Sequence, residues 1–489
     1  MRIMVYCHGL NGGPKMVDLN NIKNIHCIGI GGIGLSAIAD ILISRGFTVT
    51  GSDMNQNETV ERLMKDGAKI SLGHRAKNVE NADLVVYSAA IGKDNPEIVR
   101  AHELGIPCVT RAQMLGTLMK DYDTSIAVSG THGKTTTTSM ISLIMQKAEL
   151  DPTICVGGNL GEIHGNVRVG KSGYFITEAC EYVDSFLELN PKIEIILNID
   201  SDHLDYFKDI NHIVNSFEVF AGLLPEDGIL FAYNDNPFVR QVIKGRKNVI
   251  TFGIDENSDY YADDIVFDQD GHPSFTVMHG GEEITRVALS VPGEHNLLNA
   301  LAACACCHAL GIDADLIAET LSEFKGTQRR FDVMGMTREG MKIIDDYAHH
   351  PTDIKATLDA ASNMKHDRMW CIFQPHTYTR TIALFKEFGE AFKMADVVVL
   401  AEIYAAREKN IHKISSKSLV SEIKKDFPDK DVYFFSDFDD IASFVYNNAG
   451  PDDLVLTMGA GDVYKIGEMI LELDAKDVRV SKRGSRIND

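Results

Sequence analysis

Short apolar runs rich in β-branched residues alternate with stretches of helical period along most of the chain. Between Asn24 and Tyr122 these runs read IHCIGI, FTVTGSD, ADLVVYSAA and IPCVT. The run that starts at Asn24–Cys27 is followed by a helical pattern over Leu35–Arg45. Because strands that alternate with helices indicate βαβ units, we predict a small parallel sheet with crossover helices in this region.

Two further regions repeat this rhythm. The middle one contains TSIAVSG, GYFITEA, KIEIILNID and GILFAYN, and it ends after a helical pattern from Asn296 to Leu310. The last one contains MKIIDD, WCIFQP, DVVVLAEIY, VYFFSD and DLVLTMGAG. All three regions are therefore predicted to be α/β, and the first and last to be Rossmann-like. The predicted segments are a loosely attached extension at 1–23, three domains at 24–123, 124–325 and 326–475, and a frayed polar tail at 476–489.

Length and charge narrow the class of protein. The chain has 489 residues, which at roughly 150 residues per domain agrees with about three domains. Its net charge of −22 argues against a nucleic-acid or anionic-membrane partner, since either would need a concentrated positive surface. Apolar runs stay short of the ~18 residues that span a bilayer, and the start MRIMVYCHGLNGGPKMV lacks a signal-peptide core. We expect a cytoplasmic enzyme whose oligomeric state the sequence leaves open.

The cysteines do not form a recognisable framework. There are nine, an odd number, and they are scattered along the chain. The segment CACCH, from Cys304 to His308, fits the spacing of covalent haem attachment. It lies within the alanine-rich helical stretch NLLNALAACACCHALGI, where small thiols pack as apolar residues. We therefore favour packing over haem binding.

The first glycine-rich turn has the outline of a dinucleotide fingerprint. The segment CIGIGGIGLSAIADILISRGFTVTGSD runs from a strand through glycines into a helix and on to a second strand that ends at Asp53. Such glycines let backbone N–H groups approach a diphosphate at a helix N-terminus, and Asp53 is placed to accept from ribose hydroxyls. The candidate diphosphate residues are Gly29, Gly31, Gly32, Gly34 and Asp53. The turn recognises phosphates rather than nicotinamide, so NAD and other diphosphates both remain open.

A second glycine turn opens the middle domain in IAVSGTHGKTTTTSMISLIMQ. The turn Gly130-Thr131-His132-Gly133 precedes Lys134, which can reach the β and γ phosphates, and Thr135, whose hydroxyl can bind Mg²⁺. Val128 stands where the general pattern has another glycine, so the match is a shortened G-x-x-G-K-T. It predicts a central P-loop ATPase-type domain.

Two side chains follow neighbouring strands of this domain. Glu178 ends GYFITEA, and His203 follows KIEIILNID. Ligands of open α/β sheets bind beyond the carboxyl ends of the strands, which is where these side chains are predicted to lie. Glu178 offers a hard oxygen ligand to Mg²⁺, and His203 could bind a metal or a phosphate oxygen.

Seven separated motifs make the chain resemble the Mur ligase family. In order they are GTHGKTTTT, TEACEYVDSFL, NIDSDHLDYF, GEHNLLNALAA, RRFDVMG, DDYAHHPT and PHTYTRT, and the resemblance extends from Asn24 to about Leu473. It implies that the first domain holds a UDP-sugar and that no nicotinamide is used. Among family activities, it is closest to the ATP-dependent joining of L-alanine to the lactyl carboxylate of UDP-N-acetylmuramate. That reaction passes through an acyl phosphate and belongs to peptidoglycan precursor synthesis.

The resemblance also implies roles for individual residues. Lys134, Glu178 and His203 are the expected catalytic centre, with two Mg²⁺ ions held by Thr135, Glu178 and His203. The expected ATP-binding residues are Gly130, Thr131, His132, Gly133, Lys134, Thr135, Thr136, Asn296, Asn299, Arg330 and Asp346. The amino-acid end of the site is expected at Tyr347, His349, His376 and Arg380, where Arg380 could pair with the alanine carboxylate.

One position departs from relatives, several of which carry a carbamylated lysine about fifteen residues after the histidine of the D-H motif. Here that position is Glu218, so a carboxylate could help to hold the second metal; an exposed helical glutamate is nearly as good an explanation. Three alternatives to L-alanine addition remain: a recycling ligase that adds a tripeptide to the same sugar nucleotide, an NAD-linked oxidoreductase, and a non-catalytic binding protein. The intact Lys134, Glu178 and His203 disfavour the last.

Overall fold

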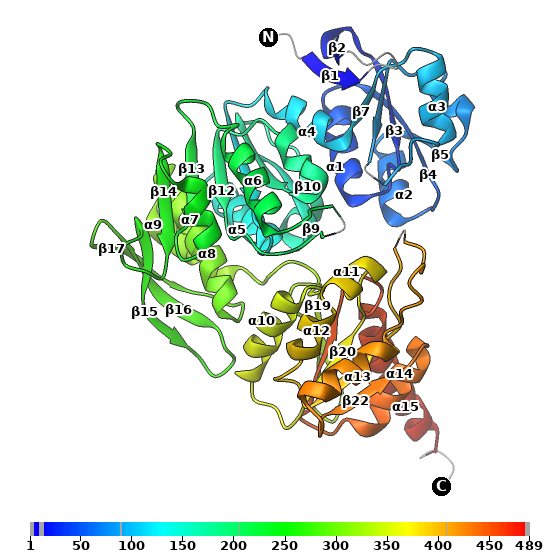
Figure 1. The fold of residues 1–489 in the computed structure, drawn as a ribbon, viewed down its shortest axis with the longest axis vertical. Helices are drawn as coiled ribbons and strands as arrows, with labels where there is room; N and C mark the ends of the chain where they lie inside the picture. Colours follow the sequence, from blue (N-terminus) through cyan, green and yellow to red (C-terminus); the bar gives the residue numbers. More distant parts are fainter. Residues whose placement is uncertain (1–3, 9–13, 89, 205, 407, 485–489) are drawn as a thin grey trace. The chain divides into compact units, whose positions relative to one another are not determined.

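A computed structural model describes residues 4–8, 14–88, 90–204, 206–406 and 408–484 (Figure 1). Contacts group the chain into two compact units. The first comprises Met1–Ile199, Ile213–Tyr261 and Ala302–Ile317, and the second comprises Asp200–His212, Ala262–Leu301 and Ala318–Asp489. Unit boundaries thus fall within individual helices and strands, and the domain boundaries given above stay predictions.

The N-terminal part of the first unit forms a parallel sheet, as predicted. Its strand order is β5-β4-β3-β6-β7, and α1 begins two residues earlier than the predicted helix. Its elements are β3 (Asn24–Ile28), α1 (Ile33–Ser44), β4 (Thr48–Asp53), α2 (Glu58–Lys65), β5 (Lys69–Leu72), η2 (Ala76–Val79), β6 (Leu84–Tyr87), α3 (Pro96–Glu103), β7 (Cys108–Thr110) and α4 (Arg111–Met119). The strand order reverses at β3, so the first glycine turn lies at the switch point where such sheets bind ligands.

The region before β3 is more ordered than the predicted loose extension. Strands β1 (Met4–His8) and β2 (Pro14–Asp18) pair antiparallel, and η1 (Leu19–Asn21) follows. Within the first unit, β1 contacts β7 and α4. Residues 1–3 and 9–13 of the extension lie outside the described residues.

The first unit also contains seven consecutive strands of a ten-stranded central sheet, in the order β10-β9-β11-β8-β12-β13-β14. Its elements are β8 (Thr124–Ser129), α5 (Lys134–Lys147), β9 (Thr153–Leu160), η3 (Gly161–Ile163), β10 (Gly165–Arg168), β11 (Tyr174–Ala179), η4 (Tyr182–Glu188), β12 (Ile193–Ile196), β13 (Ile229–Tyr233), α7 (Pro237–Ile243) and β14 (Val249–Gly253). Strand β8 pairs parallel with β11 and β12, so the loop that follows β8 opens beside the ends of both neighbours.

Four described elements carry the chain across the unit boundaries: α6 (Ile210–Ala221), β15 (Tyr260–Phe267), α8 (Glu294–Ala309) and α9 (Ala314–Glu323). The thiols of Cys304, Cys306 and Cys307 on α8 are buried, in line with the packing interpretation. Burial raises the pKa of Cys304 and of Cys306 to about 12, so neither thiol is ionised at neutral pH. His308 is in hydrogen-bond contact with the Tyr260 hydroxyl at 2.8 Å.

The second unit contains the C-terminal sheet, in the order β18-β19-β23-β20-β21-β22, where only the β18–β19 pair is antiparallel among the described strands. Its elements are β18 (Asp332–Met336), β19 (Lys342–Asp346), α10 (Pro351–Ser362), β20 (Met369–Phe373), α11 (Tyr378–Ala383), α12 (Phe385–Ala391), β21 (Val397–Leu400), α13 (Lys417–Asp426), β22 (Asp431–Phe434), α14 (Phe438–Asn448), β23 (Leu454–Met458) and α15 (Tyr464–Gly484). The antiparallel hairpin β16 (Pro273–His279) and β17 (Glu282–Ala288) also belongs to this unit, and α9 (Ala314–Glu323) enters it.

Helices cover both faces of the C-terminal sheet. Alternate residues of a strand point to opposite faces, and here Cys371 packs with α10, α12 and α13 while Ile372 packs with α14 and α15. Both side chains are fully buried. A sheet buried on both faces explains why its strands read as continuous apolar runs rather than as alternating ones.

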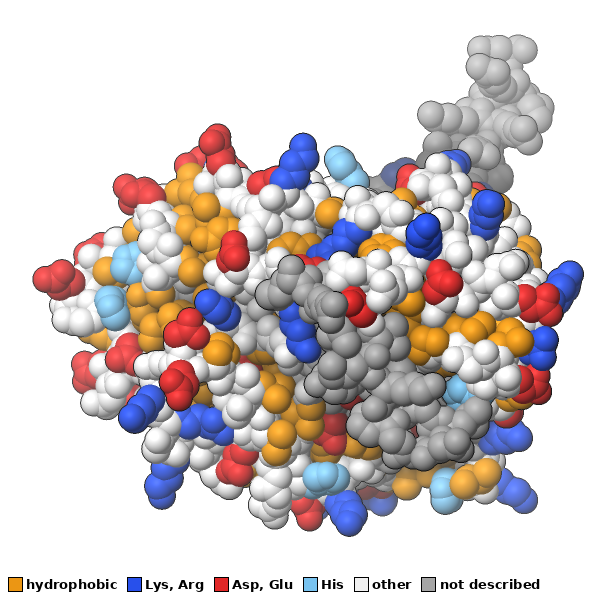
Figure 2. Space-filling model, turned by 90° about the horizontal axis from the view of Figure 1, so that it is seen from above, with side chains coloured by type: hydrophobic (Ala, Val, Ile, Leu, Met, Phe, Trp, Pro, Cys, Tyr) orange, Lys and Arg blue, Asp and Glu red, His pale blue; other side chains and the backbone are white. Residues whose placement is uncertain are grey.

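The chain after residue 476 differs from the predicted frayed tail. Helix α15 continues to Gly484, and the side chains of Glu472 and Lys476, one turn apart, form an ion pair at 3.3 Å. Residues 485–489 lie outside the described part. Among the described residues, no helix is both long and apolar enough to cross a membrane. On the coloured part of the face in Figure 2, basic side chains are interspersed with acidic ones.

Candidate active site

The phosphate loop Gly130–Gly133 joins β8 to α5 and is held by Asn198, which follows β12. The Asn198 side chain accepts a hydrogen bond from the backbone N–H of His132 at 2.8 Å and donates to the His132 carbonyl at 3.1 Å. Gly130 has a φ of +137°, and a Cβ there would lie 2.9 Å from the Cβ of Leu197. The loop therefore needs glycine at this position, and its shape is set by a neighbouring strand as well as by its own sequence.

Lys134, the first residue of α5, is engaged with a carboxylate that the sequence interpretation did not single out. Its ammonium lies 2.8 Å from Glu181 Oε2 and 3.1 Å from Oε1, and it also donates to the carbonyls of Gly130 and Thr131. Burial lowers the pKa of Lys134, but the negative charge of Glu181 outweighs it, so the pKa is raised. Lys134 is thus a charged ammonium at neutral pH.

Glu178 lies at the end of β11, as predicted from the sequence. Its carboxylate accepts a hydrogen bond from the backbone N–H of Gly157 on β9. Thr135 is buried in the first turn of α5, and a Cβ on Gly158 would meet its methyl group at 3.1 Å. Carboxylate and hydroxyl oxygens are hard donors of the kind that Mg²⁺ prefers, so this donor set fits the expected ion.

Glu218 lies on α6 and is half-buried. The interactions recorded for it involve its backbone carbonyl, which accepts from the guanidinium of Arg246 and from the N–H of Gly222. Its predicted role in holding a second metal stays a prediction.

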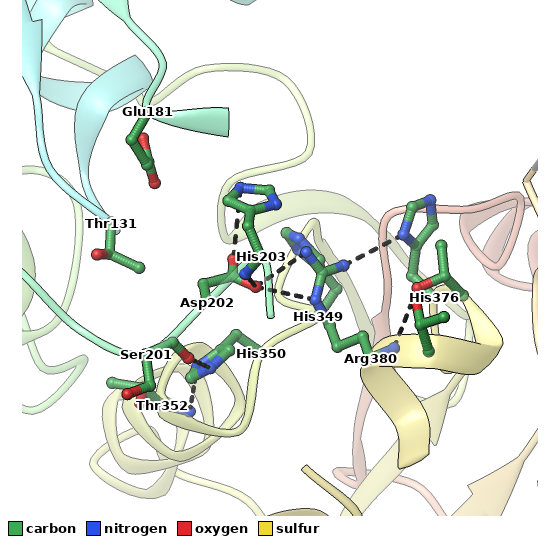
Figure 3. A network of polar contacts seen from close by, with 12 residues as sticks. Thr131, Glu181, Ser201, Asp202, His203, His349, His350, Thr352, His376 and Arg380 are labelled. Atoms are coloured by element: carbon green, nitrogen blue, oxygen red, sulfur yellow. Dashed lines mark hydrogen bonds and ion pairs between the residues drawn. The ribbon is translucent and has the colours of Figure 1, made fainter. Parts of the chain in front are cut away.

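In the second unit, Asp202 and Arg380 form a buried ion pair (Figure 3). Asp202 Oδ1 accepts from Arg380 Nε at 3.1 Å and lies 3.0 Å from Nη2, while Arg380 Nη1 is 3.3 Å from His376 Nδ1. Burial raises the pKa of Asp202, but Arg380 outweighs it and holds the pKa well below its ordinary value. The histidine of the D-H motif, His203, has a left-handed φ of +53°, and its backbone N–H donates to Asp202 Oδ1 at 2.6 Å.

The other predicted amino-acid-binding residues surround this pair. Burial, with the positive charge of Arg380, lowers the pKa of His349 to about 3 and that of His376 to about 4. Both imidazoles are therefore neutral near pH 7. The rings of His349 and His376 pack edge to face, and His349 also contacts the ring of Tyr347. The second unit thus brings Tyr347, His349, His376 and Arg380 together with His203.

The residues after Asp200 are tied to the start of α10. The imidazole of His350 lies 2.9 Å from the carbonyl oxygen of Ser201 (Figure 3). Thr352 Oγ1 donates to the Asp200 carboxylate at 2.8 Å. His350 also caps α10, because its Nδ1 accepts from the Thr352 N–H. Asp200, His350 and Thr352 thus fix the backbone that precedes the Asp202–His203 pair.

The predicted ATP-binding residues of the second unit fall into two pairs. Asn296 and Asn299 are buried one turn apart on α8, and Asn299 Nδ2 donates to Asn296 Oδ1 at 3.3 Å. The Arg330 guanidinium lies 5.1 Å from the ring centre of Tyr347. Burial raises the pKa of Asp346 to about 6, although Arg330 lowers it, and its carboxylate accepts from two backbone N–H groups.

The first glycine turn, in the first unit, is closed by Asp53, whose Oδ2 accepts from the Gly31 N–H at 2.9 Å. A Cβ on Gly31 would lie 2.8 Å from Val60 Cγ2, so the close approach requires glycine. A Cβ on Gly34 would lie 2.9 Å from Arg111 Cδ, which places the Arg111 side chain against this turn.

Four residues around these sites were not given a role from the sequence: Asn198, Glu181, Asp202 and Arg111. Glu181 and Asp202 lie inside motifs that the sequence already marked, three residues after Glu178 and one before His203, so their acidic character was an available signal. Arg111 and Asn198 are supplied by the start of α4 and the end of β12, and no local pattern links either to the turn that it contacts.

Comparisons with known proteins give a consistent picture. Family models match in order: the catalytic domain of the Mur ligase family over residues 24–123, the Mur ligase middle domain over 128–307, and the Mur ligase glutamate ligase domain over 329–461. The UDP-N-acetylmuramate–L-alanine ligase of Caldanaerobacter subterraneus is 52% identical over 461 residues, covering 94% of this chain and 100% of that protein. The ligase of the same name from Alkaliphilus metalliredigens is 50% identical over 456 residues, covering 93% and 98%.

Solved structures agree with this picture. The UDP-N-acetylmuramate-alanine ligase MurC of Thermotoga maritima matches with a TM-score of 0.79 and 30% identity, covering 94% of this chain and 100% of that one. A murein peptide ligase of Psychrobacter arcticus matches with a TM-score of 0.69 and 27% identity, covering 92% and 98%. The three-domain α/β organisation predicted from the sequence is confirmed.

Proposed function

The chain belongs to the Mur ligase family, and from this premise we propose that it is the ATP-dependent ligase that joins L-alanine to UDP-N-acetylmuramate in peptidoglycan precursor synthesis. The observation that carries the proposal is identity near 50% to ligases of that name over more than nine-tenths of the chain. Family membership favours this reaction over an NAD-linked oxidoreductase. ATP and the sugar nucleotide are cytoplasmic metabolites, so we place the reaction in the cytoplasm.

The chemistry requires an activated carboxylate. The lactyl carboxylate is a poor acylating group because oxide would have to leave, so it attacks the γ-phosphorus of ATP, giving an acyl phosphate and ADP. The amine of alanine then attacks the acyl carbon, and the tetrahedral intermediate expels phosphate to form the amide. The amine must lose its proton to solvent or a base, because only the neutral amine is a nucleophile.

The phosphate loop supports the first step. The N–H groups of Thr131 and His132 are bonded to Asn198, so the phosphates would be received by the other backbone N–H groups at the start of α5. The Lys134 ammonium supplies positive charge where the γ-phosphate is transferred. Glu178 and Thr135 would hold Mg²⁺, and His203 a second ion; bound there, such ions would offset the charge of two anionic reactants. Neighbouring strand and helix ends fix Lys134, Thr135 and Glu178 within the first unit.

The other two substrates are assigned to separate modules. The diphosphate of the UDP-sugar is received by Gly29, Gly31, Gly32 and Gly34 at the N-terminus of α1, with Arg111 as the nearby cation and Asp53 closing the turn. Alanine is assigned to Tyr347, His349, His376 and Arg380. Asp202 already occupies Nε and Nη2 of Arg380, so an alanine carboxylate would be received by the remaining N–H groups of that guanidinium.

Phosphate release with UDP-N-acetylmuramate, Mg²⁺-ATP and each amino acid in turn tests the proposal. We expect L-alanine to give the highest kcat/KM and release without the sugar nucleotide to stay at background. The tripeptide L-Ala-γ-D-Glu-diaminopimelate forms the decisive comparison, because the chain also resembles a murein peptide ligase at 27% identity. A preference for the tripeptide would replace the proposed L-alanine ligase by a recycling ligase. If neither L-alanine nor the tripeptide supports phosphate release, the ligase assignment is contradicted.

A further inference from the structure

The ammonium of Lys134 has all its hydrogen-bonding capacity satisfied by the protein itself. It has three N–H donors and four acceptors within reach, which are the carbonyls of Gly130 and Thr131 and both oxygens of Glu181. The Lys134 side chain is 14% exposed and that of Glu181 is 3% exposed. The pair is therefore a largely desolvated ion pair at the position that the triphosphate is expected to occupy.

Glu181 is held in place by its surroundings. It immediately precedes η4 and lies at the N-terminal end of that short helix, after β11. The following residues Val183 and Asp184 have left-handed φ values of +50° and +56°, and the Asp184 carboxylate accepts a hydrogen bond from the Ser216 hydroxyl on α6. A backbone fixed in this way keeps the Glu181 carboxylate beside Lys134 rather than letting it move freely into solvent.

A buried lysine that already has a counter-ion is a weaker anion receptor than a free one. An incoming phosphate must displace the Glu181 carboxylate, and charge-assisted hydrogen bonds to a buried cation are among the stronger ones. Separating the pair also leaves Glu181 desolvated without its cation, which is strongly unfavourable. Only an anion with a high charge at the right place overcomes both costs.

We propose that Glu181 is a positioning residue that competes with nucleotide phosphate for Lys134 and thereby makes the loop selective for a nucleoside triphosphate over a diphosphate. The inference rests on the proposed function, since it assumes that the loop binds ATP. A γ-phosphate reaches Lys134 and replaces Glu181. Once the γ-phosphoryl group has left, ADP offers Lys134 only its β-phosphate, so Glu181 competes more effectively for Lys134 and ADP is released.

Equilibrium binding separates this role from simple structural support. Glu181→Gln keeps the size and an acceptor oxygen but removes the negative charge. We expect it to tighten binding of Mg²⁺-ADP about tenfold and to narrow the affinity difference between ADP and a non-hydrolysable ATP analogue, both measured by isothermal titration calorimetry. In turnover, product inhibition by ADP should strengthen by a similar factor. A variant that merely damaged the site would bind both nucleotides more weakly.

Two controls fix the interpretation. Glu162→Gln removes the same charge from an exposed position on η3 and should leave both affinities unchanged. Lys134→Ala should weaken the binding of both nucleotides. Adding Glu181→Gln to Lys134→Ala should not tighten ADP binding, because there is no longer a Lys134 ammonium for which Glu181 and phosphate compete. If Glu181→Gln proves unstable, Glu181→Asp withdraws the carboxylate by one methylene and should give part of the same gain.

The outcomes are distinguishable. Unchanged or weaker ADP binding by folded Glu181→Gln and Glu181→Asp, with normal ATP binding by the wild type, would overturn the inference and leave the ligase assignment intact. Wild-type protein that binds neither nucleotide would contradict the proposed function, and the inference would fall with it. If Glu162→Gln tightens ADP binding as much as Glu181→Gln does, the effect comes from the change in net charge alone, and the inference is also overturned.

Discussion

The two glycine turns of the first unit share a local plan but obtain their cation differently. Each joins a parallel strand to a helix N-terminus, and each is closed by a group from a neighbouring strand: Asp53 for the first turn and Asn198 for the second. The second turn carries its own cation, Lys134, in the first turn of α5. The first has no lysine in its sequence, and the basic side chain that lies against it, Arg111, comes from α4.

This difference matches the chemistry proposed for each turn. A turn that only holds a diphosphate needs fixed N–H donors and a helix N-terminus, and a cation from elsewhere suffices. A turn at which a phosphoryl group is transferred needs a cation that stabilises the negative charge developing in the transition state and that still allows ADP to dissociate afterwards. Lys134 has Glu181 as a counter-ion, whereas Arg111 has no comparable carboxylate among the contacts of the described residues. The following substitutions test this difference between the two turns.

The largest effect is expected for Lys134→Ala. Removing the cation at the transferred phosphate should lower phosphate release by about three orders of magnitude or more, since electrostatic stabilisation at that position is lost. Lys171→Ala, an exposed lysine after β10, is the matched control and should keep its activity. Near-normal release by Lys134→Ala would remove the functional distinction between the two turns.

Glu178→Gln should come next, with a loss of about a hundredfold in kcat and a clear rise in the Mg²⁺ concentration that gives half-maximal rate. Titrating Mg²⁺ at saturating ATP measures this. Glu218→Gln serves as the comparison on α6, and an unchanged Mg²⁺ requirement there would exclude Glu218 from the metal site. If Glu178→Gln itself leaves the requirement unchanged, the metal lies elsewhere.

Gly31→Ala is expected to raise the KM for the UDP-sugar about tenfold while leaving the KM for ATP unaltered. Its Cβ would lie 2.8 Å from Val60 and 3.0 Å from Asp53, so the turn would have to open. Gly161→Ala on η3 is the control, because Gly161 lies outside the proposed sites and a Cβ there would meet no described atom within 4 Å. A parallel rise in both KM values would mean that the turn supports the whole unit rather than one substrate.

Arg111→Ala should raise the KM for the UDP-sugar by several-fold, which is less than the effect of rebuilding the turn, because the backbone N–H donors remain. Arg111→Lys should restore part of the affinity by returning the charge without the guanidinium geometry. Steady-state kinetics with the sugar nucleotide varied checks both variants. If neither variant changes the KM for the UDP-sugar, Arg111 is not a cation that contributes to sugar-nucleotide binding at the first turn.

The smallest effect on activity is expected at Glu194, on β12 beside the strand that carries the phosphate loop. Its carboxylate is fully buried, has no hydrogen-bond partner among the described residues, and burial raises its pKa well above the ordinary value. Because the folded protein holds this proton more tightly than the unfolded chain, Glu194 should cost stability increasingly as pH rises above about 4.5. In urea unfolding between pH 5 and 8, the free energy of unfolding of Glu194→Gln should fall less with rising pH than that of the wild type, and kcat should stay unchanged. A steeper fall in the variant would contradict this prediction.

Local sequence was enough to place the glycine turns. The pattern of strand, glycines and helix predicted both turns and the strand-end position of Glu178, because parallel strands end at a common edge of their sheet. It predicted less well where the chain is amphipathic without a sharp end, as in α15, which continues to Gly484. The hairpin of β1 and β2 was not predicted from the sequence.

By itself, the sequence determined the α/β class, the two glycine turns and the family, since each depends on residues that lie close together along the chain. Tertiary structure alone decided that Glu181 satisfies Lys134, that Arg380 is paired with Asp202, and that Arg111 lies against the first turn. The physical reason is that a charge interacts with whatever folding brings within a few ångströms of it, and pairing separated by tens or hundreds of residues leaves no periodic trace in the chain.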